Sequence, residues 1–463
     1  MARPRSHYAC TACGAQAPRW VGRCPDCGAW STMVEEPDTP LRAAGRGRAP
    51  AGGPDAPSGA IALRHVAAEA RPRLATALPE LDRVLGGGLV PGSAVLLGGE
   101  PGIGKSTLAL QVAAAAAQAG ARAAPVLYVS GEESPEQIRL RAARLDALPD
   151  ALLVLAETRV EAIADAWRAH GPELVLVDSI QTMQSERVDS APGSVAQVRE
   201  SAADLIALAK QTGAVLVLVG HVTKEGVLAG PRVLEHLVDV VLAFEGDRGQ
   251  PFRVLRAAKN RFGSTLEVGV FTMGEQGLAG VANPSELFLA ERRGDAPGSC
   301  VTAVLEGTRP LLLEVQALVA PAGYGTARRT ALGFDDGRLA LLLAVLARRG
   351  GIDALGMDVY LNVTGGMRIG EPAADLAVVL ALASSRLDLP LPPDTVAIGE
   401  VGLGGEVRRV GRVEARVQEA ARLGFARALV PAGAREALRA APLELAPMRD
   451  VADAVHWLRR SAS

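Results

Sequence analysis

The residues best suited to chemistry lie in the string VLLGGEPGIGKST, which covers residues 95–107. Residues 95–97 are apolar and predict a short buried strand, a glycine-rich turn follows, and residues 108–113 favour a helix. This is the GxxxxGK(S/T) pattern in the strand, loop and helix context that it requires. Glycines allow backbone N–H groups to converge on phosphate oxygens, and the helix N-terminus adds partial positive charge there. The string therefore predicts a site for a nucleoside triphosphate.

Each residue of this loop has an expected role. Lys105 is placed to reach the β- and γ-phosphates of ATP, and the Ser106 hydroxyl is placed to hold Mg²⁺. The residues expected to contact the nucleotide are Gly99, Glu100, Pro101, Gly102, Ile103, Gly104, Lys105, Ser106 and Thr107.

The elements that must position this loop alternate between strands and helices. Apolar runs at residues 125–130, 152–156, 174–178, 215–220 and 238–244 predict strands, and helical segments rich in Ala, Leu and Arg separate most of them. This alternation is typical of an α/β fold with a mostly parallel sheet, which binds its ligands at the carboxyl ends of the strands.

Acidic residues stand at the ends of two of these predicted strands. Asp178 ends the run LVLVD and suits a carboxylate that positions Mg²⁺ through water. Glu132 and Glu133 end another strand, and a carboxylate there can polarise the water that attacks the phosphate. We take Glu132 as the first candidate and Glu133 as the second; the structural alternative is that Ser134 and Glu133 cap the next helix.

A metal site is predicted near the N-terminus by the pattern CxxC-x10-CxxC. Two close pairs of thiolates are the donors that a tetrahedral Zn²⁺ ion needs, and the absence of a secretory signal argues against two disulfides. A unit this small has little core, so the metal is expected to hold it folded. The four expected zinc ligands are Cys10, Cys13, Cys24 and Cys27.

Two tryptophans lie in the same segment, Trp20 and Trp30, beside Arg19 and Arg23. They either contact DNA or a protein, or they cover the metal site. The fifth cysteine, Cys300, is expected to be an ordinary buried thiol.

Composition adds limits on the function. The chain has 463 residues and a formal net charge of −2, so any contact with nucleic acid must come from local patches. The N-terminus lacks the apolar segment of a signal peptide, and the apolar runs are too short to span a bilayer, so we expect a cytoplasmic protein without a membrane partner. Only four of the 49 basic residues are lysines, which makes each of them informative: Lys105, Lys210, Lys224 and Lys259.

Several strings together carry a resemblance to known families. In chain order, LDRVLGGGL, GEPGIGKST, YVSGEES, LVLVDS and LVGHVTKEG resemble the core of RecA/KaiC-type ATPases. The string AKNRFG at residues 258–263, with the four-cysteine segment before it, resembles the RadA (Sms) family of bacterial DNA repair proteins over essentially the whole chain. The resemblance implies a zinc finger at 1–38, a linker rich in Pro, Gly, Ala and Arg at 39–60, a RecA-like ATPase domain at 61–284 and a Lon-protease-like α/β domain at 285–463.

The resemblance also implies roles for further residues. His221 lies where RecA-type proteins sense the γ-phosphate, and it leads into an expected DNA-binding loop at 223–235 that holds Lys224 and Arg232. A second candidate for a DNA-binding loop is residues 184–197, where Arg187 and Arg199 flank a Gly/Pro turn.

Lys259 and Arg261 are the remaining predicted catalytic residues. They are two positions apart, so on a strand both point to one face, beside Asn260, which we group with the DNA-binding or allosteric residues. In a ring they would reach the ATP of a neighbouring subunit and stabilise γ-phosphate charge, as an arginine finger does; the alternative is a solvated sheet edge.

The C-terminal domain resembles the Lon protease domain but departs from it at the two catalytic positions. Ala373 stands where Lon has its serine, Glu414 stands where Lon has its lysine, and the chain has no lysine after Lys259. A Ser–Lys dyad cannot form, so proteolysis is not expected. A basic stretch is interpreted as a DNA path or subunit contact, or else as a solvated helix face: Arg408, Arg409, Arg412 and Arg416.

The function that the RadA resemblance implies is a DNA-dependent ATPase of recombinational DNA repair. It would bind single-stranded and branched DNA as a homohexameric ring and drive branch migration as a helicase, alongside RecA, with ATP, Mg²⁺ and Zn²⁺ as cofactors. Two alternatives remain at this stage: a DNA-binding scaffold that ATP only assembles, and a KaiC-like ATPase switch that binds no DNA.

Overall fold

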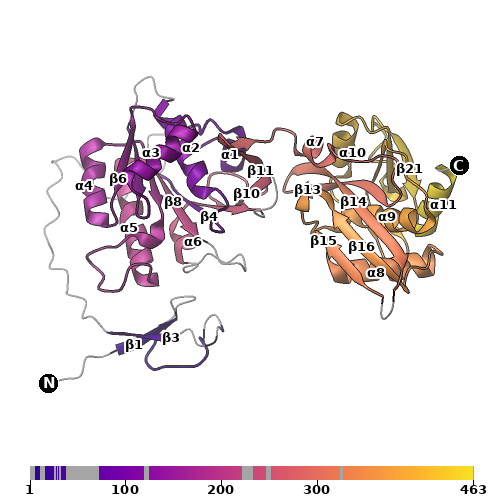
Figure 1. The fold of residues 1–463 in the computed structure, drawn as a ribbon, viewed down its shortest axis with the longest axis horizontal. Coiled ribbons are helices and arrows are strands. Elements are labelled where there is room, and N and C mark those ends of the chain that lie inside the picture. The colour runs from indigo at the N-terminus through magenta and orange to yellow at the C-terminus, as the bar shows by residue number, and fades with distance from the viewer. Residues whose placement is uncertain are drawn as a thin grey trace, which may run out of the picture. The chain divides into compact units, whose positions relative to one another are not determined.

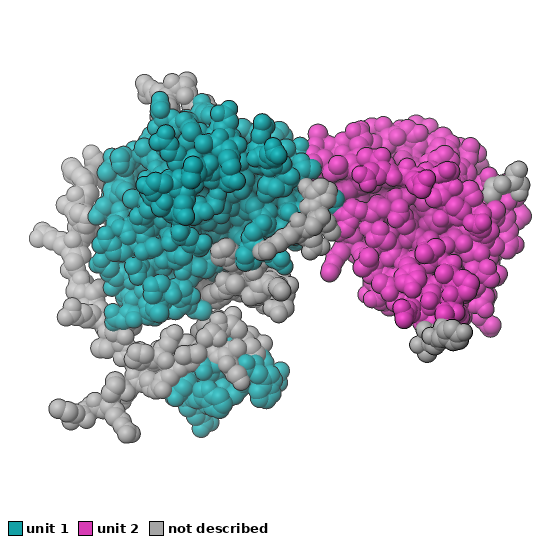
Figure 2. Space-filling model, viewed as in Figure 1, with its two compact units in different colours: residues 1–265, 271–280 teal, residues 266–270, 281–463 magenta. Residues whose placement is uncertain are grey.

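The computed structural model describes residues 6–10, 16–25, 28, 30, 33–37, 72–118, 125–221, 233–246, 252–323 and 327–461. It divides into two compact units, one of residues 1–265 and 271–280 and the other of residues 266–270 and 281–463 (Figure 2). Four predicted site residues lie outside the described residues: Cys13, Cys27, Lys224 and Arg232. Among the helices in the described ranges, none has the length and apolar character needed to cross a bilayer.

The N-terminal segment forms a small antiparallel sheet. Its strands are β1 (Ser6–Cys10), β2 (Gln16–Ala17) and β3 (Met33–Pro37), in the order β2-β1-β3 (Figure 1). The described part of its core consists of Cys10, Ala17, Cys24 and Met33. Because so few apolar side chains bury little surface, a metal bound by the cysteines is a physically reasonable source of stability.

The larger part of the first unit is built on a nine-stranded sheet. In spatial order its strands are β12 (Gly277–Gly280), β11 (Val268–Gly274), β10 (Phe252–Asn260), β9 (Val240–Glu245), β4 (Ala94–Gly99), β8 (Val215–His221), β7 (Leu174–Asp178), β5 (Val126–Ser130) and β6 (Leu152–Ala156). The run from β9 to β6 is parallel throughout, whereas β9 pairs with β10 and β11 with β12 in antiparallel fashion. The five strands predicted after the phosphate loop are confirmed, each with ends within two residues of the prediction.

Helices cover both faces of this sheet (Figure 1). Val95 and Leu97 of β4 point into one core and Ala94 and Leu96 into the other, so this strand is buried on both faces. This is why the strand reads as a continuous apolar run instead of an alternating pattern. The helices are α1 (Pro79–Leu85), α2 (Lys105–Gln118), α3 (Pro135–Arg144), α4 (Val160–His170), α5 (Val195–Thr212) and α6 (Val233–Leu237).

The second unit is a separate α/β structure on a mixed seven-stranded sheet. In spatial order its strands are β15 (Arg329–Leu332), β16 (Met357–Val363), β14 (Arg309–Pro321), β13 (Ser299–Glu306), β17 (Thr395–Ala397), β20 (Arg427–Pro431) and β21 (Glu444–Met448). A short hairpin of β18 (Glu400–Val401) and β19 (Val407–Arg408) follows β17 in the sequence. Its helices are α7 (Pro284–Leu289), α8 (Asp336–Arg349), α9 (Asp375–Leu387), α10 (Val413–Arg422) and α11 (Val451–Ser461).

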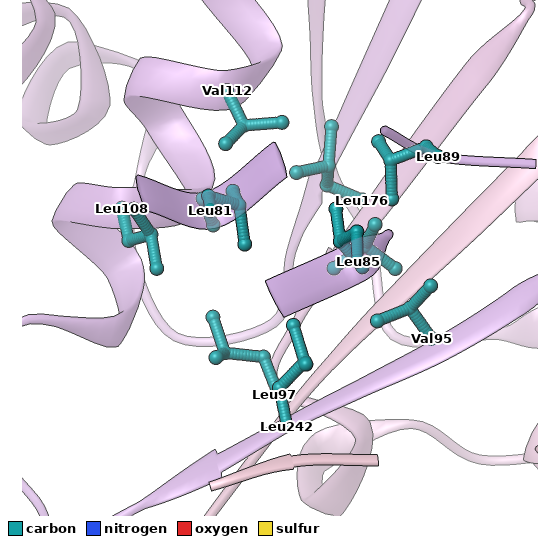
Figure 3. A pocket seen from close by; sticks show the side chains of 11 residues that line it. Leu81, Leu85, Leu89, Val95, Leu97, Leu108, Val112, Leu176 and Leu242 are labelled. Atoms are coloured by element: carbon teal, nitrogen blue, oxygen red, sulfur yellow. The ribbon is translucent and has the colours of Figure 1, made fainter. Parts of the chain in front are cut away.

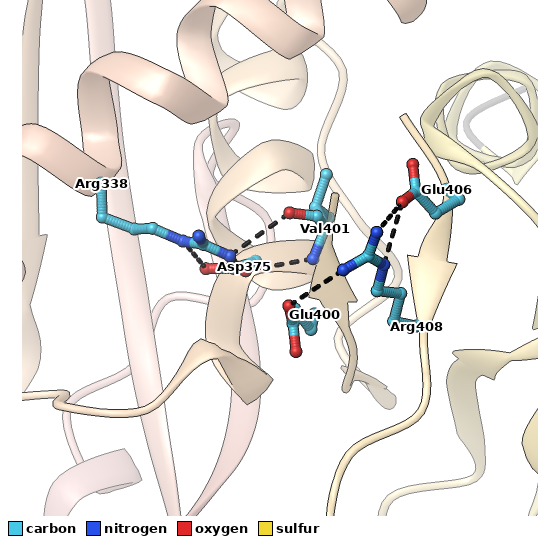
Figure 4. A network of polar contacts seen from close by, with 6 residues as sticks. All are labelled: Arg338, Asp375, Glu400, Val401, Glu406 and Arg408. Atoms are coloured by element: carbon cyan, nitrogen blue, oxygen red, sulfur yellow. Dashed lines mark hydrogen bonds and ion pairs between the residues drawn. The ribbon is translucent and has the colours of Figure 1, made fainter. Parts of the chain in front are cut away.

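Buried charges occupy the part of this unit that we compared with the protease site. Ala373 is buried, and Asp375 two residues later is fully buried and forms an ion pair with Arg338. The Asp375 carboxylate also accepts a hydrogen bond of 3.0 Å from the N–H of Val401 (Figure 4). Burial raises the pKa of Asp375, while the hydrogen bond from Arg338 acts in the opposite direction.

Our expectation for Arg416 was wrong in both of its forms. Its side chain is 1% exposed and donates two hydrogen bonds to the Glu371 carboxylate, of 2.6 and 2.7 Å, and one of 2.6 Å to the carbonyl of Ala303. Helical spacing placed Arg416 one turn after Arg412, but spacing alone did not show that Glu371, far away in the chain, lies opposite it. Arg408 is exposed and pairs with Glu406 (Figure 4).

The Arg416–Glu371 pair leads to a stability prediction. Glu371→Ala leaves a buried guanidinium without its carboxylate, which we expect to cost about 3 kcal/mol, whereas removing an exposed pair by Glu406→Ala should cost less than about 1 kcal/mol. Hydrogen exchange of α9 in the full chain measures the difference, and the first cost corresponds to exchange faster by about 150-fold. Equal exchange in the two variants would contradict a stabilising role for the buried pair.

Candidate nucleotide-binding site

The phosphate loop connects the end of β4 to the start of α2. Gly102 and Gly104 have φ angles of +79° and +115°, in a region that favours glycine. A Cβ at Gly104 would also lie 2.6 Å from Cε of Met273, the flexible end of that side chain, which would have to move. The loop therefore needs its glycines chiefly for the turn, and α2 begins directly after it at Lys105.

Lys105 is buried under the loop that precedes it. Its side chain is 4% exposed, and Nζ donates hydrogen bonds to the carbonyls of Gly99 at 2.8 Å and Glu100 at 2.9 Å. Burial lowers the pKa of Lys105, and the charges of Asp178 and Glu132 act to raise it. The fold thus brings together three charged residues that the sequence predicted as catalytic, and an ammonium has a third N–H for a phosphate oxygen.

Asp178 is oriented by a residue that the sequence analysis missed. The hydroxyl of Tyr128, on the neighbouring strand β5, donates a hydrogen bond of 2.7 Å to Oδ2 of Asp178. Tyr128 is 1% exposed, and burial together with the Asp178 charge raises its pKa well above the ordinary value. Tyr128 reaches Asp178 because β5 pairs with β7 in parallel. The sequence does not reveal this pairing, because two helices and β6 separate the two strands in the chain.

The two neighbouring glutamates have different partners. Glu132 is exposed and accepts a hydrogen bond of 2.7 Å from Oγ of Ser179, the residue after Asp178. Glu133 forms an ion pair with Arg141 of α3. The cap of α3 is made by Ser134 with Gln137, so Glu133 takes no part in the capping box that we considered.

His221 ends the strand next to the phosphate loop. In the parallel pair of β4 and β8, its backbone is level with Gly99, the last residue of β4. Its side chain lies outside the described residues, as do Lys224 and Arg232 beyond it.

The other predicted DNA loop, 184–197, is organised by its own last residue. Gln197 is 3% exposed, accepts a hydrogen bond from the N–H of Ser185, and donates to three carbonyls, those of Ser185, Val188 and Ser190. Arg187 in this loop forms ion pairs with Glu200 and Asp204 of α5. These carboxylates offset the positive charge that would attract a DNA phosphate.

Lys259, Asn260 and Arg261 lie at the opposite end of the sheet from the phosphate loop of the same chain. Asn260 pairs with Val240, which is level with Val95 at the beginning of β4. The four steps from Val95 to Gly99 correspond to about 13 Å along the strand. These residues are therefore not brought to the nucleotide site of their own chain.

In their own chain these three residues have structural contacts. Nζ of Lys259 donates to the carbonyls of Glu235 at 2.7 Å and Val238 at 2.8 Å, at the end of α6. Arg261 is 55% exposed on its side chain and pairs with Asp239 at 3.1 Å. Nδ2 of Asn260 donates to carbonyls at the end of α1, and its Oδ1 accepts from the N–H of Phe262 at 2.9 Å.

A small apolar cavity lies between α1, α2 and the sheet (Figure 3). Its volume is about 20 Å³, and it is lined by Leu81, Leu85, Leu89, Val95, Leu97, Leu108, Ala109, Val112, Leu176, Val217 and Leu242. With no polar side chain in its lining, it suits neither nucleotide nor ion. The cavity is a small gap in the packing of α1 and α2 against the sheet.

In the N-terminal sheet, the two described cysteines fit a structural zinc site. Cys10 and Cys24 are 1% and 2% exposed and belong to one cluster. Trp20 and Trp30 are 58% and 72% exposed, which is contrary to the alternative that they cover the metal. The guanidinium of Arg23 lies 5.9 Å from the Trp30 ring centre. Cys300, in the other unit, is fully buried, and burial raises its pKa to about 12.

A parallel sheet with a GxxxxGK(S/T) loop and acidic residues at the ends of neighbouring strands defines a P-loop nucleotide-binding protein of the α/β class. Comparison with known families agrees: residues 62–227 match the family described as AAA domain, and residues 8–35 match the family described as Rubredoxin metal binding domain.

Relatives match along nearly the whole chain. The DNA repair protein RadA of Bacillus subtilis is 51% identical over 439 residues, with 93% of each chain covered. The protein of the same name from Brucella abortus is 51% identical over 471 residues, which cover 100% of this chain and 99% of the relative. That of Pseudomonas aeruginosa is 52% identical over 433 residues, with 94% of each chain covered. The chain belongs to the RadA family.

The different partners of the two glutamates lead to a test of which one activates water. We expect Glu132→Gln to lower kcat of ATP hydrolysis by about 100-fold or more while ATP still binds, because the amide cannot accept the proton. Glu133→Gln serves as the matched control and should lower kcat by less than about tenfold. Steady-state ATPase rates with separate measurements of nucleotide affinity decide the matter; the reverse order of effects would assign the role to Glu133.

Proposed function

We propose that this chain is a DNA-dependent ATPase of recombinational DNA repair. It binds single-stranded and branched DNA as a homohexameric ring and drives branch migration as a helicase, alongside RecA. The name shared by the relatives supports the repair role, and the AAA domain supports ATP turnover. The observation that carries the proposal is the position of Lys259 and Arg261, at the end of the sheet away from their own phosphate loop.

The hydrolytic step follows from the residues around the loop. Lys105 would bind oxygens of the β- and γ-phosphates, Ser106 would hold Mg²⁺, and Asp178, oriented by Tyr128, would position the ion through water. Mg²⁺ neutralises charge on the phosphates when bound. Glu132 accepts a proton from the water that attacks the γ-phosphorus, while the bond from that phosphorus to the ADP oxygen breaks.

A neighbouring subunit completes the site in this proposal. Arg261 is the stronger candidate for the residue that reaches across, because more than half of its side chain is exposed. Nζ of Lys259 is already bound by two carbonyls, so Lys259 also holds the segment from which Arg261 projects. A contact that joins one end of a subunit to the other end of the next is head-to-tail, and such contacts form a ring when the rotation between subunits closes.

DNA is bound in this proposal by the loop at 223–235. His221 joins the phosphate loop, through its pairing with Gly99, to the start of this segment, which holds Lys224 and Arg232. Cations on such a loop neutralise DNA phosphates without reading sequence. The loop at 184–197 is the weaker candidate, because Arg187 is paired with carboxylates.

The second unit acts as a platform and not as a protease in this proposal. The side chain at position 373 is a buried methyl group, Glu414 is exposed, and the sequence of this unit contains no lysine. The four N-terminal cysteines hold Zn²⁺, whose role is structural. We place the protein in the cytoplasm, where thiolates remain reduced.

Unwinding of a forked DNA by the wild type and by Lys105→Ala tests the motor. We expect ATP-dependent unwinding by the wild type and none by the variant, because the variant lacks the cation that binds the phosphates. Equal unwinding by both proteins would defeat the motor. ATPase stimulated by single-stranded DNA without unwinding would favour the scaffold, and no stimulation would favour the switch.

Mixed rings test whether Arg261 acts across a subunit interface. Arg261→Ala and Lys105→Ala should each lose about 100-fold or more in kcat, since one lacks the residue that reaches the neighbour and the other lacks an intact phosphate loop. Mixing them should restore part of the ATPase activity, because some interfaces then pair an intact loop with an intact arginine. No recovery, in mixtures shown by native mass spectrometry to contain both variants, would count against action across the interface.

A further inference from the structure

Arg253 lies against the phosphate loop, although no motif marks it. It is the second residue of β10, at the end of that strand opposite to Lys259, and its side chain is only 6% exposed. Nε donates a hydrogen bond of 3.3 Å to the carbonyl of Ile103, and Nη1 donates one of 2.8 Å to the carbonyl of Phe252. A residue 150 positions away along the chain thus contacts the loop at the peptide that precedes Gly104.

The fold provides a slot for this side chain. Gly246 follows β9 with a φ of +147°, and a Cβ there would lie 2.8 Å from Cδ of Arg253. Any larger residue at position 246 would push the arginine stem out of place. A guanidinium is costly to bury, so its placement beside the Ile103 carbonyl of the loop needs a reason beyond the filling of space.

The contact fixes the direction of one peptide group. A peptide is planar and trans, so its C=O and N–H point in opposite directions. When Arg253 binds the Ile103 carbonyl on one side, the N–H of Gly104 is directed to the other side, and the nearby cation polarises that N–H further. The side chains of Met273, Leu278 and Phe244 lie within 3.6 Å of where a Cβ of residue 104 would stand.

We propose that Arg253 is a positioning residue of the nucleotide site, which holds the Ile103–Gly104 peptide so that the Gly104 N–H faces the phosphates. This inference rests on the nucleotide binding that we propose above. It assigns no contact between Arg253 and the nucleotide. The loop carries its own cation in Lys105, and Arg253 supplies the orientation of the backbone donor beside it.

The test compares three variants of the full chain. Arg253→Met keeps an unbranched stem about as long as the arginine chain up to Nε but removes the hydrogen bonds and the charge, Arg253→Lys keeps the charge, and Arg256→Met is the matched control. Arg256 lies on the same strand but pairs with Glu245 at 3.2 Å and is a third exposed. Titration calorimetry gives the Kd of ATP and of ADP for each protein, and melting without nucleotide reports on the fold.

We expect Arg253→Met to raise the Kd of both nucleotides by about tenfold, because the loop contacts phosphates that both contain. KM for ATP should rise by a similar factor, while kcat should stay within about threefold of the wild-type value. The Kd of Arg253→Lys should lie between those of the wild type and Arg253→Met, and Arg256→Met should match the wild type. A wild-type Kd in a folded Arg253→Met overturns the proposal, as does a lower melting temperature with unchanged Kd. If Arg253→Met does not fold, the Kd of Arg253→Lys decides. Failure of the wild type to bind ATP would instead refute the proposed function.

Discussion

The parallel strands of the first unit have their carboxyl ends on the same side of the sheet, and the nucleotide site depends on this geometry. β4 delivers the phosphate loop, β8 delivers His221, β7 delivers Asp178 and β5 leads to Glu132. The helices between the strands return the chain each time to the side where the strands begin. Residues that are distant in the sequence therefore meet at the carboxyl ends. Hydrogen bonds then connect neighbouring strand ends, from Tyr128 to Asp178 and from Ser179 to Glu132. A shift of any one strand would separate these groups.

Strand β10 is antiparallel to its neighbour β9, so it runs from the side of the phosphate loop to the side where the parallel strands begin. Its first residues lie beside the phosphate loop, where Arg253 binds the Ile103 carbonyl, and its last residues lie at the far edge with Arg261 and Asp239. One strand therefore supports the site of its own chain and presents a cation away from it. This polarity is compatible with the head-to-tail assembly proposed above, in which a second copy would bring that cation to a phosphate.

Two ion pairs of the second unit each have one fully buried partner. Asp375 with Arg338 and Glu371 with Arg416 lie close in the chain to Ala373, where the resembling protease has its serine. Each pair also binds main-chain groups, at Val401 in one case and at Ala303 in the other. Through these contacts each pair joins segments that are far apart in the sequence.

The sequence by itself determined the phosphate loop, the α/β class and the strand ends, because these depend on local patterns: glycine spacing, apolar runs and terminal acids. It also placed Asp178 and Glu132 correctly as charges near Lys105, since parallel strands bring their carboxyl ends together. Only the tertiary structure decided what lies opposite each side chain. The order of strands put Tyr128 on Asp178, the reversal of β10 put Arg253 on the loop, and long-range packing buried Arg416 against Glu371. These contacts join residues tens to more than a hundred positions apart, and no local spacing encodes such a separation.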